Sequence, residues 1–174
     1  MTTASPSRSY GRVRQAIHWV ATVLILALIP TGLIMADTLD DGLRLTLYQV
    51  HLAIGWIVVA LAIWRIVLRV RERIAAPAEL APWNRRLLHG VHWAVAVFPL
   101  LLATSGFGAI LQNDLLPVLQ AGTAPPATLD VATARTGHQI GAYLFSGLLV
   151  VHVAGIVRHQ MRFGGALAPM VRRR

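Results

Sequence analysis

Four long apolar stretches separated by polar links dominate the pattern of the chain. None of them contains an aspartate or a glutamate, and they cover about residues 17–36, 47–68, 87–111 and 137–161. Each has about the twenty residues that an α-helix needs to cross the hydrocarbon core of a bilayer. The internal prolines, Pro30 and Pro99, are tolerated there because neighbouring helices satisfy the freed backbone groups. The pattern therefore predicts one membrane domain, residues 1–174, with four spanning helices.

Composition agrees with a protein of the lipid bilayer. The chain has 174 residues, of which 56% are hydrophobic and 13% are charged, and its mean hydropathy is +0.60. Soluble domains carry about 25% charged residues. There is no cysteine, which excludes disulfides, thiolate-bound iron–sulfur clusters and cysteine-type zinc sites.

All sixteen basic residues are arginines, and their distribution predicts the orientation of the chain. The N-terminal tail, the link between the second and third segments and the C-terminal tail, together with Arg65 and Arg158 at the adjoining ends of their segments, carry a charge of +12. The other two links carry −3, from five aspartates with Arg44 and Arg135. The positive-inside rule then puts both termini in the cytoplasm. The net charge of +9 is thus a topology signal, and we expect no nucleic-acid partner.

The link between the third and fourth segments, about residues 113–137, is the only long one, and the same rule puts it outside. Within it, Asp130 is expected to cap an extension of the fourth helix beyond the membrane. No cleavable signal peptide is expected, because the first fifteen residues are polar and the first apolar segment is long enough to span.

Histidines are the candidate functional residues. An ionisable residue in a membrane helix is costly and by default marks function. One lone histidine is well explained by a hydrogen bond to a carbonyl of a neighbouring helix, but seven of them without carboxylates in the helices favour a shared function. All seven lie within or at the edge of the apolar segments: His18, His51, His89, His92, His138, His152 and His159.

The spacing of these residues predicts two pairs. His138 and His152 are fourteen residues apart, which is about four helical turns, so they share a face and lie about 21 Å apart along the axis. In an antiparallel bundle, His51 near the outer end of the second segment can face His138. His18 near the cytoplasmic end of the first segment can face His152.

Two opposed pairs of imidazoles at two depths are typical of bis-histidine ligation of two haem irons. A zinc or copper site needs three or four ligands at one depth, and a proton relay would include carboxylates. His89 and His92 lie at a depth that lets them compete with His18 as the inner ligand, and the spacing alone leaves this choice open. The alternative to a haem protein is a non-enzyme: a haem-free transporter or scaffold whose histidines only bind across helices.

Several stretches together resemble the prokaryotic cytochrome b561 family, from about Arg12 to Phe163. They are AIHW (16–19), QVHLAIGW (49–56), HGVHW (89–93), TGHQIGAYLFSGLLVVH (136–152) and RHQ (158–160). The resemblance implies an all-α integral membrane protein, an antiparallel four-helix bundle enclosing two b-type haems. It implies that the axial ligands of the haem irons are His18, His51, His138 and His152. His89 and His92 then become groups near the haem, its propionates or the quinone.

The short stand-alone members of this family resemble superoxide oxidases, multi-pass proteins of the bacterial inner membrane. The resemblance implies that periplasmic superoxide is oxidised to dioxygen and that ubiquinone accepts the electrons. Arg135 and Arg44 are the outer-side candidates, either for steering the anion, for pairing with haem propionates or for anchoring helix ends. The charge of −3 on the outer links argues against attraction of the superoxide anion over long distances.

On the cytoplasmic side, His159 lies seven residues after His152 and shares its face, at the membrane interface. With Arg158, it is the candidate for binding and protonating ubiquinone. The alternative function is an electron-transfer subunit that links a partner oxidoreductase of the hydrogenase or formate dehydrogenase type to the quinone pool. Such subunits tend to be longer and to carry an additional helix, which favours the stand-alone enzyme.

Overall fold

A computed structural model describes residues 11–72, 82–126 and 133–164, and this part of the chain contains helices and no strand. The helices are α1 (Arg12–Asp37), α2 (Asp41–Glu72), α3 (Pro82–Gln112), α4 (Leu115–Gln120) and α5 (Thr133–Phe163). The four long ones each contain a window apolar enough to cross a membrane, with a mean hydropathy of 2.1. The predicted all-α membrane architecture is therefore confirmed.

The long helices extend beyond the apolar segments from which they were predicted. α2 has 32 residues, or about 48 Å at 1.5 Å per residue, whereas the hydrocarbon core is about 30 Å thick. Its N-terminus is capped by the Asp40 carboxylate, which accepts a hydrogen bond of 2.7 Å from the Leu43 amide. α3 begins at Pro82, a position at which proline is favoured because its missing N–H has no helical partner. Polar residues thus continue the helices past the bilayer core.

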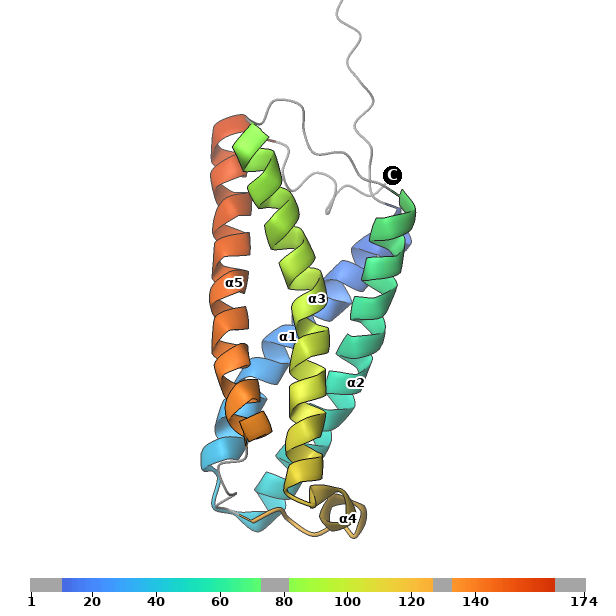
Figure 1. Cartoon of the computed structure of the whole chain (residues 1–174), viewed down its shortest axis with the longest axis vertical. Helices are drawn as coiled ribbons and strands as arrows, with labels where there is room; N and C mark the ends of the chain where they lie inside the picture. Colours follow the sequence, from blue (N-terminus) through green and yellow to red (C-terminus); the bar gives the residue numbers. More distant parts are fainter. Residues whose placement is uncertain (1–10, 73–81, 127–132, 165–174) are drawn as a thin grey trace, which may run out of the picture.

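The helices are packed unevenly. α1 packs on α2, α2 on α3, and α3 on α5, and the short α4 lies against α3. Figure 1 shows α3 and α5 running side by side while α1 runs obliquely behind them. Among the described residues, α5 has no comparable close packing against α1 or α2. The bundle is therefore packed least closely where α5 faces α1 and α2, the two helices that are predicted to share histidine pairs with α5.

A seven-residue repeat divides the bundle into three layers. Seven residues are nearly two turns, so each repeat keeps the same face with a drift of about 20°. In α5 the repeat is His138, Phe145 and His152. The corresponding positions are His18, Ile25 and Gly32 in α1, His51, Val58 and Arg65 in α2, and His92, Pro99 and Gly106 in α3.

The middle layer of this repeat is the core. Ile25, Val58 and Phe145 are buried and form one cluster, 3–7% exposed, and Pro99 is buried in α3. The cluster separates two polar layers. We call the outer layer His51 and His138 with Gly32 and Gly106, and the inner layer His18, Arg65, His92 and His152.

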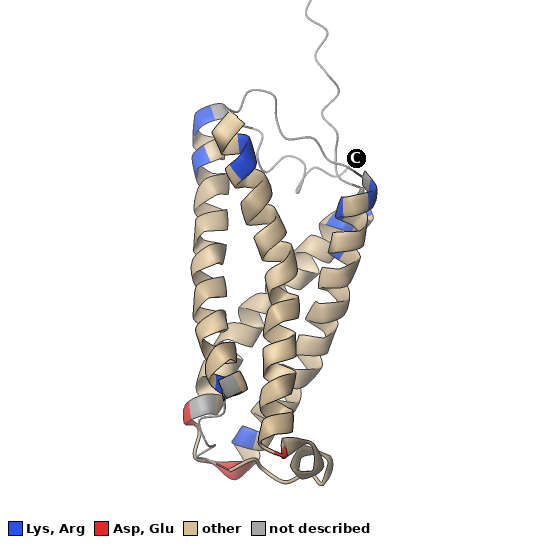
Figure 2. Ribbon diagram, in the orientation of Figure 1, with Lys and Arg blue, Asp and Glu red and all other residues tan. Residues whose placement is uncertain are grey.

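The two ends of the bundle differ in charge. Figure 2 shows arginines gathered at the end near the inner layer and aspartates at the opposite end. We call these the basic end and the acidic end. The separation matches the charge asymmetry from which we predict that the basic end is cytoplasmic, and that orientation stays a prediction.

The long link holds a short helix that the apolar pattern did not indicate. α4 follows Asp114, which adopts a left-handed conformation with φ 48°, and Leu115 within it is 3% exposed. α5 begins at Thr133, a few residues before the predicted start. Asp130, the expected cap of α5, lies outside the described residues.

Candidate functional site

The outer layer brings together one predicted pair of histidines. The rings of His51 in α2 and His138 in α5 have centroids 6.2 Å apart and meet edge to face at 74°. Both side chains are partly buried, and they come from two helices that do not pack closely on each other. A planar cofactor is accommodated more readily between two such helices than between helices in close contact.

The hydrogen bonds of this pair fix the orientation of both rings. His138 Nδ1 donates to the backbone oxygen of Leu102 at 2.8 Å, and Ser105 Oγ lies 3.3 Å away. Because a carbonyl only accepts, the proton of a neutral His138 sits on Nδ1 and Nε2 keeps a lone pair. A neutral imidazole held by its other nitrogen is the usual form of a metal-binding histidine.

A hydrogen bond to Thr31 fixes the ring of His51 through Nδ1, as the Leu102 carbonyl does for His138. The Thr31 hydroxyl donates to the Ala27 carbonyl at 2.9 Å and lies 3.2 Å from His51 Nδ1. Since its one proton is used in α1, this hydroxyl accepts a hydrogen bond from His51 Nδ1. Nε2 of His51 is then also left as an acceptor.

Two glycines make room for these imidazoles. A Cβ atom at Gly32 would lie 3.1 Å from His51 Cε1, and one at Gly106 would lie 3.0 Å from both Cε1 and Nδ1 of His138. Contacts this short force a neighbour to move, so each glycine allows an imidazole to lie directly on a facing helix. The sequence offered a signal for both, because each lies fourteen residues after a histidine of its own helix, His18 or His92.

The inner layer holds three imidazoles rather than two. The rings of His92 and His152 have centroids 5.1 Å apart and meet at 85°. His18 lies near enough to both of them to interact electrostatically. The structure therefore brings His18 to the level of His152, as the spacing predicts, but it is His92 whose ring contacts His152. Among the described residues, no group of three or more histidines or carboxylates is arranged to hold a metal ion directly.

The Nδ1 atoms of this layer are not equivalent. His92 Nδ1 donates to the Leu88 carbonyl in its own helix at 2.8 Å. His18 Nδ1 is buried and has no hydrogen-bond partner in the part of the chain that the structure describes. An unpaired polar atom in a buried position is costly. His18 Nδ1 therefore needs a partner from outside the described residues.

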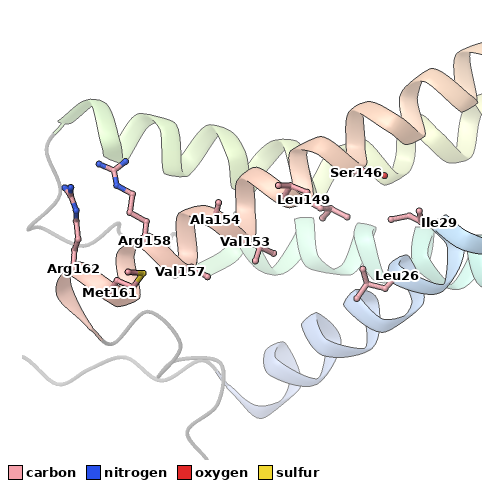
Figure 3. Close-up of a pocket in the computed structure, with 11 residues that line it drawn as sticks. Leu26, Ile29, Ser146, Leu149, Val153, Ala154, Val157, Arg158, Met161 and Arg162 are labelled. Atoms are coloured by element: carbon pink, nitrogen blue, oxygen red, sulfur yellow. The ribbon is translucent and has the colours of Figure 1, made fainter.

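His89 and His159 lie towards the basic end. His89 is exposed and one turn before His92, while His159 is half-buried two turns beyond His152. Arg158 is exposed and lies at one end of a groove between α1 and α5 with a volume of about 750 Å³. Figure 3 shows Arg158 and Arg162 extending side by side from α5, with apolar side chains such as Leu26 and Val153 along the rest of the groove.

Arg44 anchors the loops at the acidic end. Its side chain is buried, and its Nε donates to the Pro125 carbonyl at 2.6 Å. Its Nη1 donates to the Thr38 and Leu39 carbonyls at 3.1 and 3.0 Å, and its Nη2 pairs with the Asp41 carboxylate. Of the roles that the sequence left open for Arg44, these contacts support the anchor.

Arg135 is the arginine near the outer pair. It is half-buried, one turn before His138, and interacts electrostatically with Tyr48.

Comparison with known proteins identifies a family. A family model described as prokaryotic cytochrome b561 matches residues 9–173. This is nearly the whole chain, including all four long helices. No curated protein matches the chain.

Proposed function

The chain belongs to the prokaryotic cytochrome b561 family, and from this membership we propose that it is a superoxide:ubiquinone oxidoreductase with two haems. The family makes it a multi-pass bacterial membrane cytochrome b that binds haem b and transfers electrons. The number of haems, the donor and the acceptor are our proposal. The observation that carries it is the outer pair, two oriented imidazoles near Arg135 at the acidic end.

The residues of both layers fit haem b. His51 and His138 would hold the outer haem, because their Nδ1 atoms have partners and their Nε2 atoms are left as acceptors. His18 and His152 would hold the inner haem, because both lie in the inner layer and their helices, α1 and α5, are not closely packed on each other. When bound, the two haems supply a one-electron path between the two polar layers.

Helix packing supports the same two pairs. α3 and α5 pack closely, so His92 and His152 already have their rings in contact. α5 packs less closely on α1 and α2, which carry His18 and His51. A porphyrin therefore fits more readily between α5 and those two helices, and His92 remains as a group beside the inner haem.

Superoxide is the proposed donor at the acidic end. It is an anion that crosses lipid poorly, so a site outside the core is required. Two superoxide ions each give up one electron and leave as dioxygen, and one ubiquinone takes up the two electrons with two protons to form ubiquinol. Arg135 raises the local concentration of the anion next to the outer pair.

Ubiquinone is the proposed acceptor at the basic end. The groove between α1 and α5 is almost wholly apolar, which suits an isoprenoid tail. Arg158 at its end donates hydrogen bonds to a quinone oxygen. His159 lies on the face of His152 and can deliver protons from the water on its side of the membrane.

We expect Arg135→Gln to lower the rate of superoxide-driven quinone reduction about tenfold at low salt, because electrostatic steering contributes about 10–10³ to association rates. The haem content should stay unchanged. Arg135→Lys, which keeps the charge, should retain most of the rate. Rates measured against ionic strength should fall steeply for the wild type and weakly for Arg135→Gln. Equal rates and equal salt dependence would remove Arg135 from the proposal.

We expect Gly106→Ala to weaken the outer haem site, because the added Cβ would lie 3.0 Å from the His138 ring. Haem quantification and the reduced α-band should reveal a loss of outer haem. The matched control is Gly90→Ala in the same helix, where a Cβ would meet nothing within 4 Å. Similar haem contents in the two variants would contradict the role of Gly106.

The function is tested by giving superoxide to the purified, haem-loaded protein in the presence of a soluble ubiquinone analogue. We expect ubiquinol to form at a rate that exceeds the reaction without protein and that disappears with superoxide dismutase. A haem-loaded protein that is inactive alone would contradict the proposal. It would favour the electron-transfer subunit, which needs its partner oxidoreductase.

A further inference from the structure

Arg65 is a charged residue in the interior of the second spanning helix. It lies fourteen residues after His51 and seven after Val58, which is 4% exposed. The repeat that turns His51 toward His138 and Val58 into the core therefore also turns Arg65 into the bundle. It occupies the position in the inner layer at which the other three long helices carry a histidine.

The surroundings of Arg65 contain imidazoles and cations. His18, His92 and His152 each interact with it electrostatically, and so do the cations Arg69 and Arg14. The described part of the chain gives Arg65 no carboxylate partner and no hydrogen bond. A cation placed in a membrane interior needs a counter-charge.

The neighbouring arginines differ in this respect. Arg14 donates to the Leu68 carbonyl at 3.1 Å, and the guanidinium of Arg69 lies 5.1 Å from the centre of the Trp93 ring. Both have contacts with other elements of the chain near the basic end. Arg65 lies deeper, in the same layer as the unpartnered Nδ1 of His18, so two groups of one layer lack a partner within the described chain.

We propose that Arg65 is the counter-charge of the inner haem, and that its guanidinium pairs with a haem propionate. The planar guanidinium matches a carboxylate with two parallel hydrogen bonds. A fixed positive charge beside the inner haem stabilises the reduced state, so it raises the midpoint potential of that haem and favours electron flow from the outer layer to the inner one. This inference rests on the proposed inner haem.

The test is a spectroelectrochemical titration of three haem-loaded variants, with the inner haem identified as the one that His152→Ala removes. Arg65→Gln should lower the reduction equilibrium constant of the inner haem at least tenfold, which is 59 mV for one electron, and leave the outer haem unchanged. Arg65→Lys should keep most of the wild-type potential. Arg69→Gln removes the same charge one turn nearer the basic end and should shift the potential less.

Two results would overturn the proposal: equal potentials for Arg65→Gln and the wild type, or equal shifts for Arg65→Gln and Arg69→Gln. If Arg65→Gln instead loses the inner haem and keeps the outer one, while Arg65→Lys keeps both, the counter-charge is supported. Loss of the inner haem from both Arg65 variants would contradict it, because charge would then not be the property that matters.

A second measurement separates a propionate contact from a distant field effect. Protein reconstituted with the dimethyl ester of haem b has no free carboxylate to pair with Arg65, so the difference between the wild type and Arg65→Gln should shrink. An undiminished difference would contradict the contact. A wild-type protein that binds no inner haem at all would instead refute the proposed function, which keeps the two failures distinguishable.

Discussion

His138→Ala is expected to yield a folded protein that binds one haem instead of two and reduces quinone no faster than the reaction without protein. His138 is the α5 member of the outer pair, and its ring is held by the Leu102 carbonyl with its Nε2 left as an acceptor. No other histidine of the described chain lies in the outer layer to replace it. Haem quantification and superoxide-driven quinone reduction measure the two effects.

Variants of the partner residue, His51, and of the adjacent residue, Gln139, supply the comparison for His138→Ala. His51→Ala should behave in the same way, because it removes the opposite imidazole of the pair. Gln139→Ala changes the adjacent exposed residue and should keep both haems and full activity. The assignment of the outer pair is wrong if His138→Ala retains two haems, or if it loses the haem that His152→Ala also removes.

His18→Ala is expected to remove the inner haem, whereas His92→Ala should retain it with a shifted spectrum. His18 comes from α1, which packs less closely on α5 and leaves space for a porphyrin. His92 comes from α3, which packs directly on α5, so its ring already contacts that of His152. The loss in His18→Ala should be one haem equivalent per chain, with quinone reduction reduced to background.

This is the more decisive of the two tests, because the inner layer offers three imidazoles for two ligand positions. His152→Ala should remove the inner haem under either assignment, so it marks the spectrum of that haem. If His18→Ala retained the inner haem and His92→Ala lost it, His92 rather than His18 would be the ligand. In that case, the helix α3 rather than α1 would supply the second imidazole.

The spans and the level of each histidine could be predicted from the sequence because both depend on helix geometry. An apolar run of about twenty residues fixes a spanning helix, and fourteen residues return a side chain to the same face. His51 facing His138 follows from these two facts and from antiparallel packing. The contact of His92 with His152 does not, because it depends on which helices pack closely.

The contacts that depend on folded loops and on close helix packing could not be predicted from the sequence. The anchoring role of Arg44 requires Pro125, eighty-one residues away in the chain, to return to the start of α2. The clearance at Gly32 and Gly106 depends on the distance between facing helices. Arg65 did carry a signal, its spacing of fourteen residues from His51, but its meaning depends on the histidines of the other helices.

The measurement that tests the central claim most directly is the haem content of the purified wild-type protein, combined with a redox titration of its reduced-minus-oxidised spectrum. An oriented outer pair and an inner layer of imidazoles predict two haem b groups per chain, both low-spin, with two separate midpoint potentials. One haem per chain, or none, in a preparation saturated with haem would contradict the account.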